Sequence, residues 1–207
     1  GILENNNEIG YGYQDDPLTE QKHKGKKLTW YFFNEKAHDF MWAADPDYIH
    51  QIAQVPNGPK LHFFYQQGQA TRDWKKLPEI LISAFQYMNT HFGTYPFSDF
   101  YVIQGGDGGM EYPMSTLITG HRDLLSLVGV TVHEALHSWY QGVLATNESY
   151  YHWMDEGYTS YASSLTMDHL MGADNNRSNA QNYTNYFSLV SSGKEEPMST
   201  HADYFET

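Results

Sequence analysis

The chain has 207 residues, which suffice for one large domain or for one domain and part of another, and its 17 Tyr and 11 Phe can help to bury a core. The formal net charge of −13 argues against nucleic acid or an anionic membrane as a partner, and no stretch approaches the roughly 18 apolar residues of a membrane span. The absence of cysteine excludes disulfides, thiolate metal ligands and a cysteine nucleophile.

The chain starts at Gly1 without an initiator methionine, and no signal-peptide pattern follows. We therefore expect an excised fragment of a longer protein, whose compartment a missing targeting segment does not reveal. Our expectation leans towards a bacterial periplasmic or secreted protein. The sequence leaves its oligomeric state open.

The first quarter of the chain changes from polar to aromatic. Residues 1–26 are rich in Asn, Asp, Gly and Gln and indicate a loop or a remnant. The aromatic runs Leu28–Phe33 and Phe40–Ala44 favour strands. Pro56–Pro59 indicates a turn, and Leu61–Tyr65 favours a further strand.

The middle of the chain alternates between helix and strand. Apolar residues recur at helical spacing over about residues 71–92, and Gly93 ends this predicted helix. Phe100–Ile103 favours a strand that enters the glycine-rich loop Gly105–Gly109. The M-E-Y-P segment and Thr116–Thr119 are expected to make the next strand.

Three helices are predicted after the glycine-rich loop and the strand that follows it. The first runs from about Asp123 to Leu144, the second from about His152 to Met171, and the third from Asn176 to Ser191. The tail to Thr207 is expected to be irregular.

The first of these helices contains an H-E-x-x-H motif. His133 and His137 are four residues apart, so on a helix they share one face and can bind one metal ion. Glu134 lies beside this pair, where a general base must stand to take a proton from a metal-bound water.

A catalytic zinc keeps three protein ligands and one open position, so a third ligand is needed, and Glu156 in W-M-D-E-G is the candidate. In this composition H-E-x-x-H arises by chance with a probability of roughly 3–4%, and a Glu at one set downstream spacing lowers this to roughly 0.2%. The alternative is a helix with two solvated or core histidines.

Two further features have alternative interpretations. The loop Gly105–Gly109 lacks the Lys-Ser/Thr of a phosphate-binding loop and is not the dinucleotide fingerprint, so it is better interpreted as a loop that lets backbone approach a peptide. Glu111 can be an ordinary surface carboxylate, or it can anchor the free α-amino group of a substrate by a charge-assisted hydrogen bond.

The spacing H-E-x-x-H, eighteen residues, then Glu156 resembles the gluzincin metallopeptidases, and specifically the M1 aminopeptidase family. Trp139, Tyr140, Trp153 and Tyr161 also match, and Gly108-Gly109-Met110-Glu111-Tyr112-Pro113 resembles the G-x-M-E-N exopeptidase motif of the family. The resemblance covers roughly residues 30–207.

The resemblance implies an α+β fold, with a thermolysin-like metallopeptidase catalytic domain that is incomplete at its C-terminal side. Its mixed β-sheet precedes the helices that carry the motif and the third ligand. Residues 1–54 are then a remnant or the end of a preceding β-rich domain, and residues 55–207 are the partial catalytic domain.

The activity implied by the resemblance is that of a zinc aminopeptidase acting on peptides with a free N-terminus. His133, His137 and Glu156 bind Zn²⁺, and Glu134 is the general base. The substrate-binding residues are Glu111, Gly108, Gly109 and Met110, with Glu111 anchoring the α-amino group. A zinc endopeptidase, or a non-catalytic module that binds zinc or peptide, remains an alternative.

The sequence departs from the family pattern at three places. Tyr112 replaces Asn after the motif glutamate, Gln141-Gly142 replaces Gly-Asn, and Asp155 replaces Asn before the ligand glutamate. A bacterial branch with M-E-Y-P and D-E-G is similar, so we interpret these as subfamily features that bear on substrate preference. The transition-state tyrosine of the family corresponds to a position after Thr207.

Overall fold

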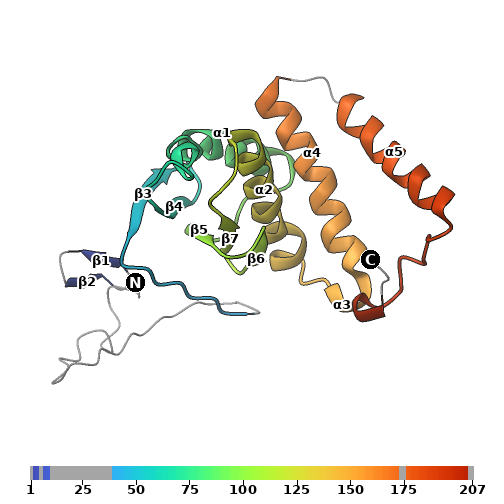
Figure 1. Cartoon of the computed structure of the whole chain (residues 1–207), viewed down its shortest axis with the longest axis horizontal. Helices are drawn as coiled ribbons and strands as arrows, with labels where there is room; N and C mark the ends of the chain where they lie inside the picture. The colour runs from blue at the N-terminus through green and yellow to red at the C-terminus, as the bar shows by residue number, and fades with distance from the viewer. Residues whose placement is uncertain (1, 5–6, 10–38, 173–175, 205–207) are drawn as a thin grey trace.

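The computed structural model describes residues 2–4, 7–9, 39–172 and 176–204. Near the N-terminus, β1 (Ile2–Glu4) and β2 (Asn7–Ile9) form an antiparallel pair. The main body combines a second, larger sheet with several helices (Figure 1).

The larger sheet is mixed and has the strand order β3-β4-β5-β7-β6. β3 (Tyr48–Gln54) pairs antiparallel with β4 (Lys60–Gln66), and β4 pairs parallel with β5 (Asp99–Gly105). β5 pairs parallel with β7 (Ser115–Thr119), and β6 (Met110–Tyr112) closes the sheet as an antiparallel edge strand. The M-E-Y segment therefore lies at an edge of the sheet.

One predicted strand is absent from the structure, and another lies outside the residues that the structure describes. The predicted strand Phe40–Ala44 is wrong, because residues 39–47 form no strand and Phe40 and Trp42 are 50% and 70% exposed. Aromatic residues favour a strand where a neighbouring strand packs beside them, and none of the described strands pairs with this run. The predicted strand Leu28–Phe33 lies outside the described residues.

The segment predicted as one strand over M-E-Y-P and residues 116–119 is instead a hairpin. Tyr112 pairs with Ser115 across the two-residue turn Pro113-Met114. Met114 has a φ of 58°, which reverses the chain, and proline cannot donate a ladder hydrogen bond. The turn brings Glu111 back beside β7, opposite Thr116.

The pairing of β3 with β4 crosses the expected domain boundary between residues 54 and 55. All seven residues of Tyr48–Gln54 have partners in β4. This strand therefore belongs to the sheet of the expected catalytic part. For the residues before Tyr48 the division remains a prediction.

The connection from β4 to β5 contains the first predicted helix. It consists of a 3₁₀ segment, η1 (Arg72–Lys76), followed by α1 (Leu77–His91). Proline in the first turn of α1 is favourable there, because its missing N–H would have no partner in the helix. Gly93, with a φ of 105°, follows the helix end as predicted.

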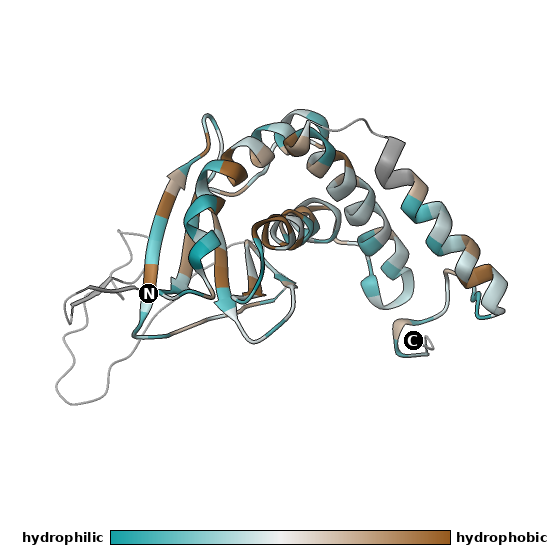
Figure 2. Cartoon of the chain, turned by 45° about the horizontal axis from the view of Figure 1, so that its top comes forward, coloured by the Kyte–Doolittle hydropathy of each residue, from teal (hydrophilic) through white to brown (hydrophobic). Residues whose placement is uncertain are grey.

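The predicted helix that carries the H-E-x-x-H motif is α2 (Leu124–His137), continued by the π-helical segment η2 (Ser138–Val143). Asp123 caps α2, because its Oδ1 accepts a hydrogen bond of 2.9 Å from the backbone N–H of Ser126. In Figure 2 this hydrophobic helix lies between the sheet and the long helix Tyr158–Met171.

The last third of the described chain is largely helical as predicted, but the short helix at residues 148–152 was not predicted. α3 (Glu148–His152) leads through the π-helical segment η3 (Trp153–Gly157) into α4 (Tyr158–Met171). α5 (Asn176–Ser192) lies beyond α4 at the far side of the molecule in Figure 1. The tail after α5 is irregular apart from the short η4 (Ala202–Tyr204).

The core lies between the sheet and helices α1, α2 and α4. Its largest buried side chains come from the sheet, η1, α1 and α2, and include Phe63, Tyr65, Trp74, Phe85, Phe100, Leu127 and Leu136. No helix of the described chain combines the length and the apolar character that crossing a membrane requires.

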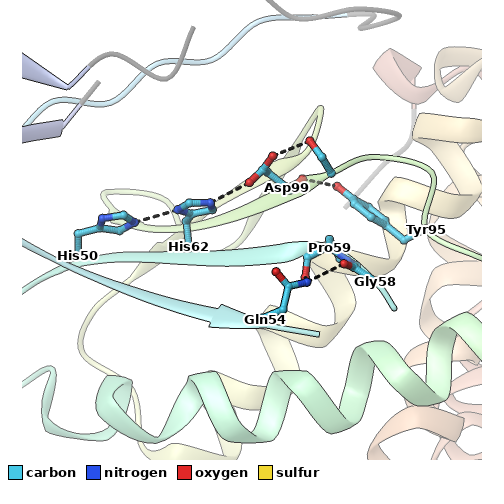
Figure 3. A network of polar contacts seen from close by, with 8 residues as sticks. His50, Gln54, Gly58, Pro59, His62, Tyr95 and Asp99 are labelled. Carbon is cyan, nitrogen blue, oxygen red and sulfur yellow. Dashed lines mark hydrogen bonds and ion pairs between the residues drawn. The ribbon is translucent and has the colours of Figure 1, made fainter. Parts of the chain in front are cut away.

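A polar chain links three adjacent strands beside this core (Figure 3). His62 on β4 is completely buried, and its Nε2 is 2.9 Å from Asp99 Oδ1 on β5. His62 Nδ1 is 2.9 Å from His50 Nε2 on β3. The Asp99 carboxylate accepts a hydrogen bond from Nε2–H of His62. In a neutral His62 the other nitrogen, Nδ1, carries no proton, so it accepts a hydrogen bond from Nε2–H of His50.

Candidate metal centre

The last turn of α2 holds both histidines of the motif on one face. His133 Nε2 and His137 Nε2 are 3.2 Å apart. The four-residue spacing produces this proximity, as expected for one helical turn.

Glu156 joins this pair from the segment η3. Its Oε2 lies 3.2 Å from His133 Nε2 and 3.7 Å from His137 Nε2. Donors that each bind one tetrahedral zinc ion at about 2.1 Å lie about 3.4 Å apart. The two imidazole nitrogens and the carboxylate oxygen therefore have spacings that suit one metal ion.

The three candidate ligands differ in exposure. The side chain of His137 is 1% exposed, that of His133 26% and that of Glu156 56%. The group thus has a buried side and a side open to solvent. A substrate and a water molecule can approach from the open side, as a catalytic metal site requires.

Two short π-helical segments lie at the candidate ligands. η2 begins directly after His137, and η3 contains Glu156. The sequence predicted continuous helices through both places, and helical periodicity contains no signal for such a change. Isolated π-helical turns are rare and frequently occur at functional sites.

Asp155, which the sequence marked simply as a departure from the family pattern, contacts a predicted ligand. Its Oδ1 lies 2.6 Å from His137 Nδ1, and both side chains are at most 3% exposed. Burial opposes protonation of His137, but the hydrogen bond and charge of Asp155, with the charges of Glu111 and Glu156, outweigh burial and raise its pKa.

Glu134 lies next to the predicted ligands but is not one of the three. It is 6% exposed and lies under the backbone of Gly109. A β-carbon at Gly109 would come within 2.4 Å of Glu134 Oε1 and 2.6 Å of Val130 Cγ2. A side chain at this position would therefore displace the Glu134 carboxylate.

The surroundings of Glu134 favour its protonated form. Burial is the largest cause, and the charges of Glu111 and Glu156 add to it, while His133 and His137 oppose it; the net effect raises the pKa of Glu134 to about 7. A carboxyl group with this pKa can both accept and release a proton near neutral pH.

Glu111 approaches the same group from the edge strand β6. One carboxylate oxygen of Glu111, one of Glu134 and one ring nitrogen of His137 all lie within 4.8 Å of one another. Glu111 also lines a small cavity with Tyr112 and Gln141, two of the positions that depart from the family pattern. The predicted base and the predicted amine anchor thus lie close to the same predicted ligand and to each other.

The other predicted substrate-binding residues lie in the loop before β6 and at its start. Arg122 donates a hydrogen bond to the carbonyl oxygen of Gly108, so this carbonyl already has a partner. The carbonyl oxygen of Met110 accepts a hydrogen bond of 3.0 Å from Thr116 Oγ1. The structure therefore holds this loop against α2 and β7.

Glu148 belongs to the neighbourhood of the site but was not predicted. Its carboxylate, with those of Glu111 and Asp155, has oxygens within 4.8 Å of one another. Burial raises the pKa of Glu148, and the charges of Asp155 and Glu111 contribute further. Glu148 begins the short helix α3, which helical periodicity did not predict, so its proximity to Glu111 on β6 has no sequence signal.

Comparison with known proteins begins with the sequence. No protein-family model matches the chain. It is 50% identical over 60 residues to leucine aminopeptidase 2 of Lodderomyces elongisporus, which covers 26% of the chain and 9% of that protein. It is 42% identical over 72 residues to aminopeptidase B of Homo sapiens, which covers 32% of the chain and 10% of that protein.

Solved structures match a larger part of the chain. An M1 zinc metallopeptidase from Deinococcus radiodurans is similar with a TM-score of 0.54 at 20% identity, over 72% of this chain and 33% of that one. A mutant of the M1 zinc metallopeptidase from that organism, bound to a Tyr-Ser-Ala substrate, has a TM-score of 0.52 at 19% identity, over 74% and 35%.

The fold is therefore that of part of the catalytic domain of M1 zinc metallopeptidases, and the chain spans about a third of those solved chains. The matched curated relatives are aminopeptidases, and the chain covers about a tenth of their length. The resemblance to the M1 aminopeptidases and the α+β metallopeptidase fold are confirmed by these comparisons.

Proposed function

We propose that this chain carries the catalytic site of a zinc aminopeptidase, which removes N-terminal residues from peptides. One observation carries the proposal: ligand atoms of His133, His137 and Glu156 lie within 4.8 Å of one another, and a carboxylate oxygen of Glu111 and one of Glu134 also lie within 4.8 Å of a ring nitrogen of His137. The candidate metal ligands, a candidate general base and a carboxylate that can bind an amino group therefore lie close together.

The three ligands suit zinc, because two imidazole nitrogens and one carboxylate oxygen are a ligand set that catalytic zinc uses. When bound, zinc polarises the scissile carbonyl and lowers the pKa of a bound water towards about 7. The similarity to solved M1 zinc metallopeptidases supports zinc over other metals.

Glu134 is proposed as the proton carrier. Its carboxylate takes the proton of the attacking water and then passes it to the leaving amine. Burial under Gly109 keeps the carboxylate away from bulk water and in one place. A carboxyl group beside the metal can accept the proton from water and release it to the amine.

Glu111 is proposed as the anchor of the free N-terminus. An α-ammonium group bound to it by a charge-assisted hydrogen bond is held a few ångströms from His137, so the first peptide bond lies at the metal. The aminopeptidase relatives and the tripeptide bound to a structural neighbour support a peptide with a free amino group as the substrate.

The test is turnover of the full-length protein on a panel of aminoacyl-amides and peptides, with zinc removed by a chelator and then restored. We expect release of single N-terminal residues that stops on chelation and returns with zinc. His133→Ala should lose stoichiometric zinc and turnover together. Zinc retained at one per chain in this variant would refute the metal site, and internal cleavage of N-acetylated peptides at an equal rate would favour an endopeptidase.

A further inference from the structure

Two carboxylates that are adjacent in the sequence lie near the two ring nitrogens of His137. Asp155 Oδ1 lies 2.6 Å from Nδ1, and Glu156 Oε2 lies 3.7 Å from Nε2. One carboxylate is thus placed behind the ring, and the next is placed on the side where the metal would bind.

Both carboxylates lie in the π-helical turn η3. Successive side chains of an α-helix are separated by about 100° around the axis. A turn closed by i→i+5 hydrogen bonds contains more residues, so the angle between neighbours is smaller. Asp155 and Glu156 can therefore both point towards α2, where His137 lies.

Burial strengthens the contact between Asp155 and His137. The two side chains are 3% and 1% exposed, so water does not compete for the hydrogen bond. His133 differs, because within the described chain its polar contacts are at Nε2. His137 is therefore the ligand that the protein itself orients.

We propose that Asp155 is a positioning residue for the metal site. Its carboxylate accepts a hydrogen bond from Nδ1–H of His137. With the proton held at Nδ1, the lone pair of Nε2 is free for the metal, and the hydrogen bond fixes the plane of the ring. This inference rests on the proposed zinc site. Loss of such a hydrogen-bond partner of a metal-bound histidine typically costs about 10–100-fold in metal affinity.

The experiment measures the zinc dissociation constant by competition with a chromophoric chelator. Asp155→Ala and Asp155→Leu both remove the acceptor, and the leucine variant keeps most of the volume. We expect either variant to bind zinc about 10–100-fold more weakly. The side chain of Asp155→Asn keeps an oxygen that can accept a hydrogen bond from Nδ1–H of His137. This variant should therefore bind zinc more tightly than the alanine and leucine variants.

Asp73→Ala is the matched control. Asp73 is 8% exposed and pairs with Lys76 at 2.8 Å on η1, away from the metal group, so removing it tests the general effect of losing a buried carboxylate. Its zinc affinity should equal that of the unchanged protein. A loss in this control as large as in the Asp155 variants would overturn the proposal.

Unchanged zinc affinity in Asp155→Ala or Asp155→Leu would also overturn the proposal, as would an asparagine variant that recovers nothing. Measuring His133→Ala in parallel separates this failure from failure of the proposed function. If His133→Ala loses zinc while the Asp155 variants retain it, the metal site stands and the positioning role fails. If all variants retain zinc, the metal site itself is wrong.

Discussion

At the scale of single residues, two glutamates beside the same histidine have different surroundings. Glu134 is 6% exposed at the end of α2, and its burial raises its pKa to about 7. Glu111 lies on the edge strand β6 and is partly exposed. The buried group suits proton transfer, and the more accessible group suits binding of a cation.

Replacement of Glu134 by glutamine tests the first role. The amide cannot take a proton, so kcat of the full-length protein should fall by about 10²–10⁴-fold. Zinc content should stay at one per chain, because Glu134 is not among the three ligands. Near-normal turnover with zinc bound would show that another group is the base.

Replacement of Glu111 by alanine tests the second role in a substrate-by-mutant cycle. Loss of one charged hydrogen bond to the α-ammonium group costs about 1.5–3 kcal/mol, or roughly 10–150-fold in kcat/KM on a peptide with a free N-terminus. The acetylated form of the same peptide cannot make this bond, so any cleavage of it should be unchanged. Equal losses on both forms would refute the anchor.

At the scale of elements, the site depends on α2, which places two of the proposed ligands and the proposed base in its last turn. Its start is defined by the cap at Asp123, and its buried side packs on the sheet and α4. The end of α2 continues directly into η2, so the ligand turn has no free helix end. Its position is therefore determined by packing along the whole helix.

Asp123→Ala tests the contribution of the cap. The variant loses the acceptor for the Ser126 N–H, so the free energy of unfolding should fall by about 1 kcal/mol. Chemical denaturation followed by circular dichroism measures this change. Asp47→Ala, at an exposed position, is the control and should leave stability unchanged; an equal loss in both variants would contradict the capping role.

At the scale of the whole molecule, acid should weaken the sheet through the polar chain of Figure 3. Burial, followed by the charge of His62, lowers the pKa of His50 to about 4 from an ordinary value of 6.5. Between these values the unfolded chain binds a proton that folded His50 does not. Stability therefore falls as the pH decreases from about 6.5 to 4.

The effect should be about 1 kcal/mol, because His50 is half-buried and solvent screens its charge. The measurement is the free energy of unfolding between pH 7 and pH 4 for the unchanged protein and for His50→Gln, which should lose less stability over this range. His121→Gln, at an exposed histidine, is the control. The hydrogen bond from His62 lowers the pKa of Asp99, so its contribution is lost below this window.

The sequence alone was sufficient for features that depend on local spacing. The i, i+4 separation of His133 and His137 defines their shared face whatever surrounds the helix, and the distance of 3.2 Å between their nitrogens agrees with it. Helical periodicity likewise located α5 and the helical stretches 72–91, 124–143 and 153–171, although it did not separate the 3₁₀ and π-helical segments η1, η2 and η3 from α1, α2 and α4. These predictions succeed because hydrogen bonds within one segment determine them.

Contacts between distant segments required the tertiary structure. The approach of Glu156 and Asp155 to His137 depends on how η3 packs against α2, and the π-helical turns that permit it have no periodic signal. Pairing of β3 with β4, the hairpin that carries Glu111 and the nearness of Glu148 are also long-range. The free energy of such contacts comes from burial among residues far apart in the chain, and a local pattern cannot contain that information.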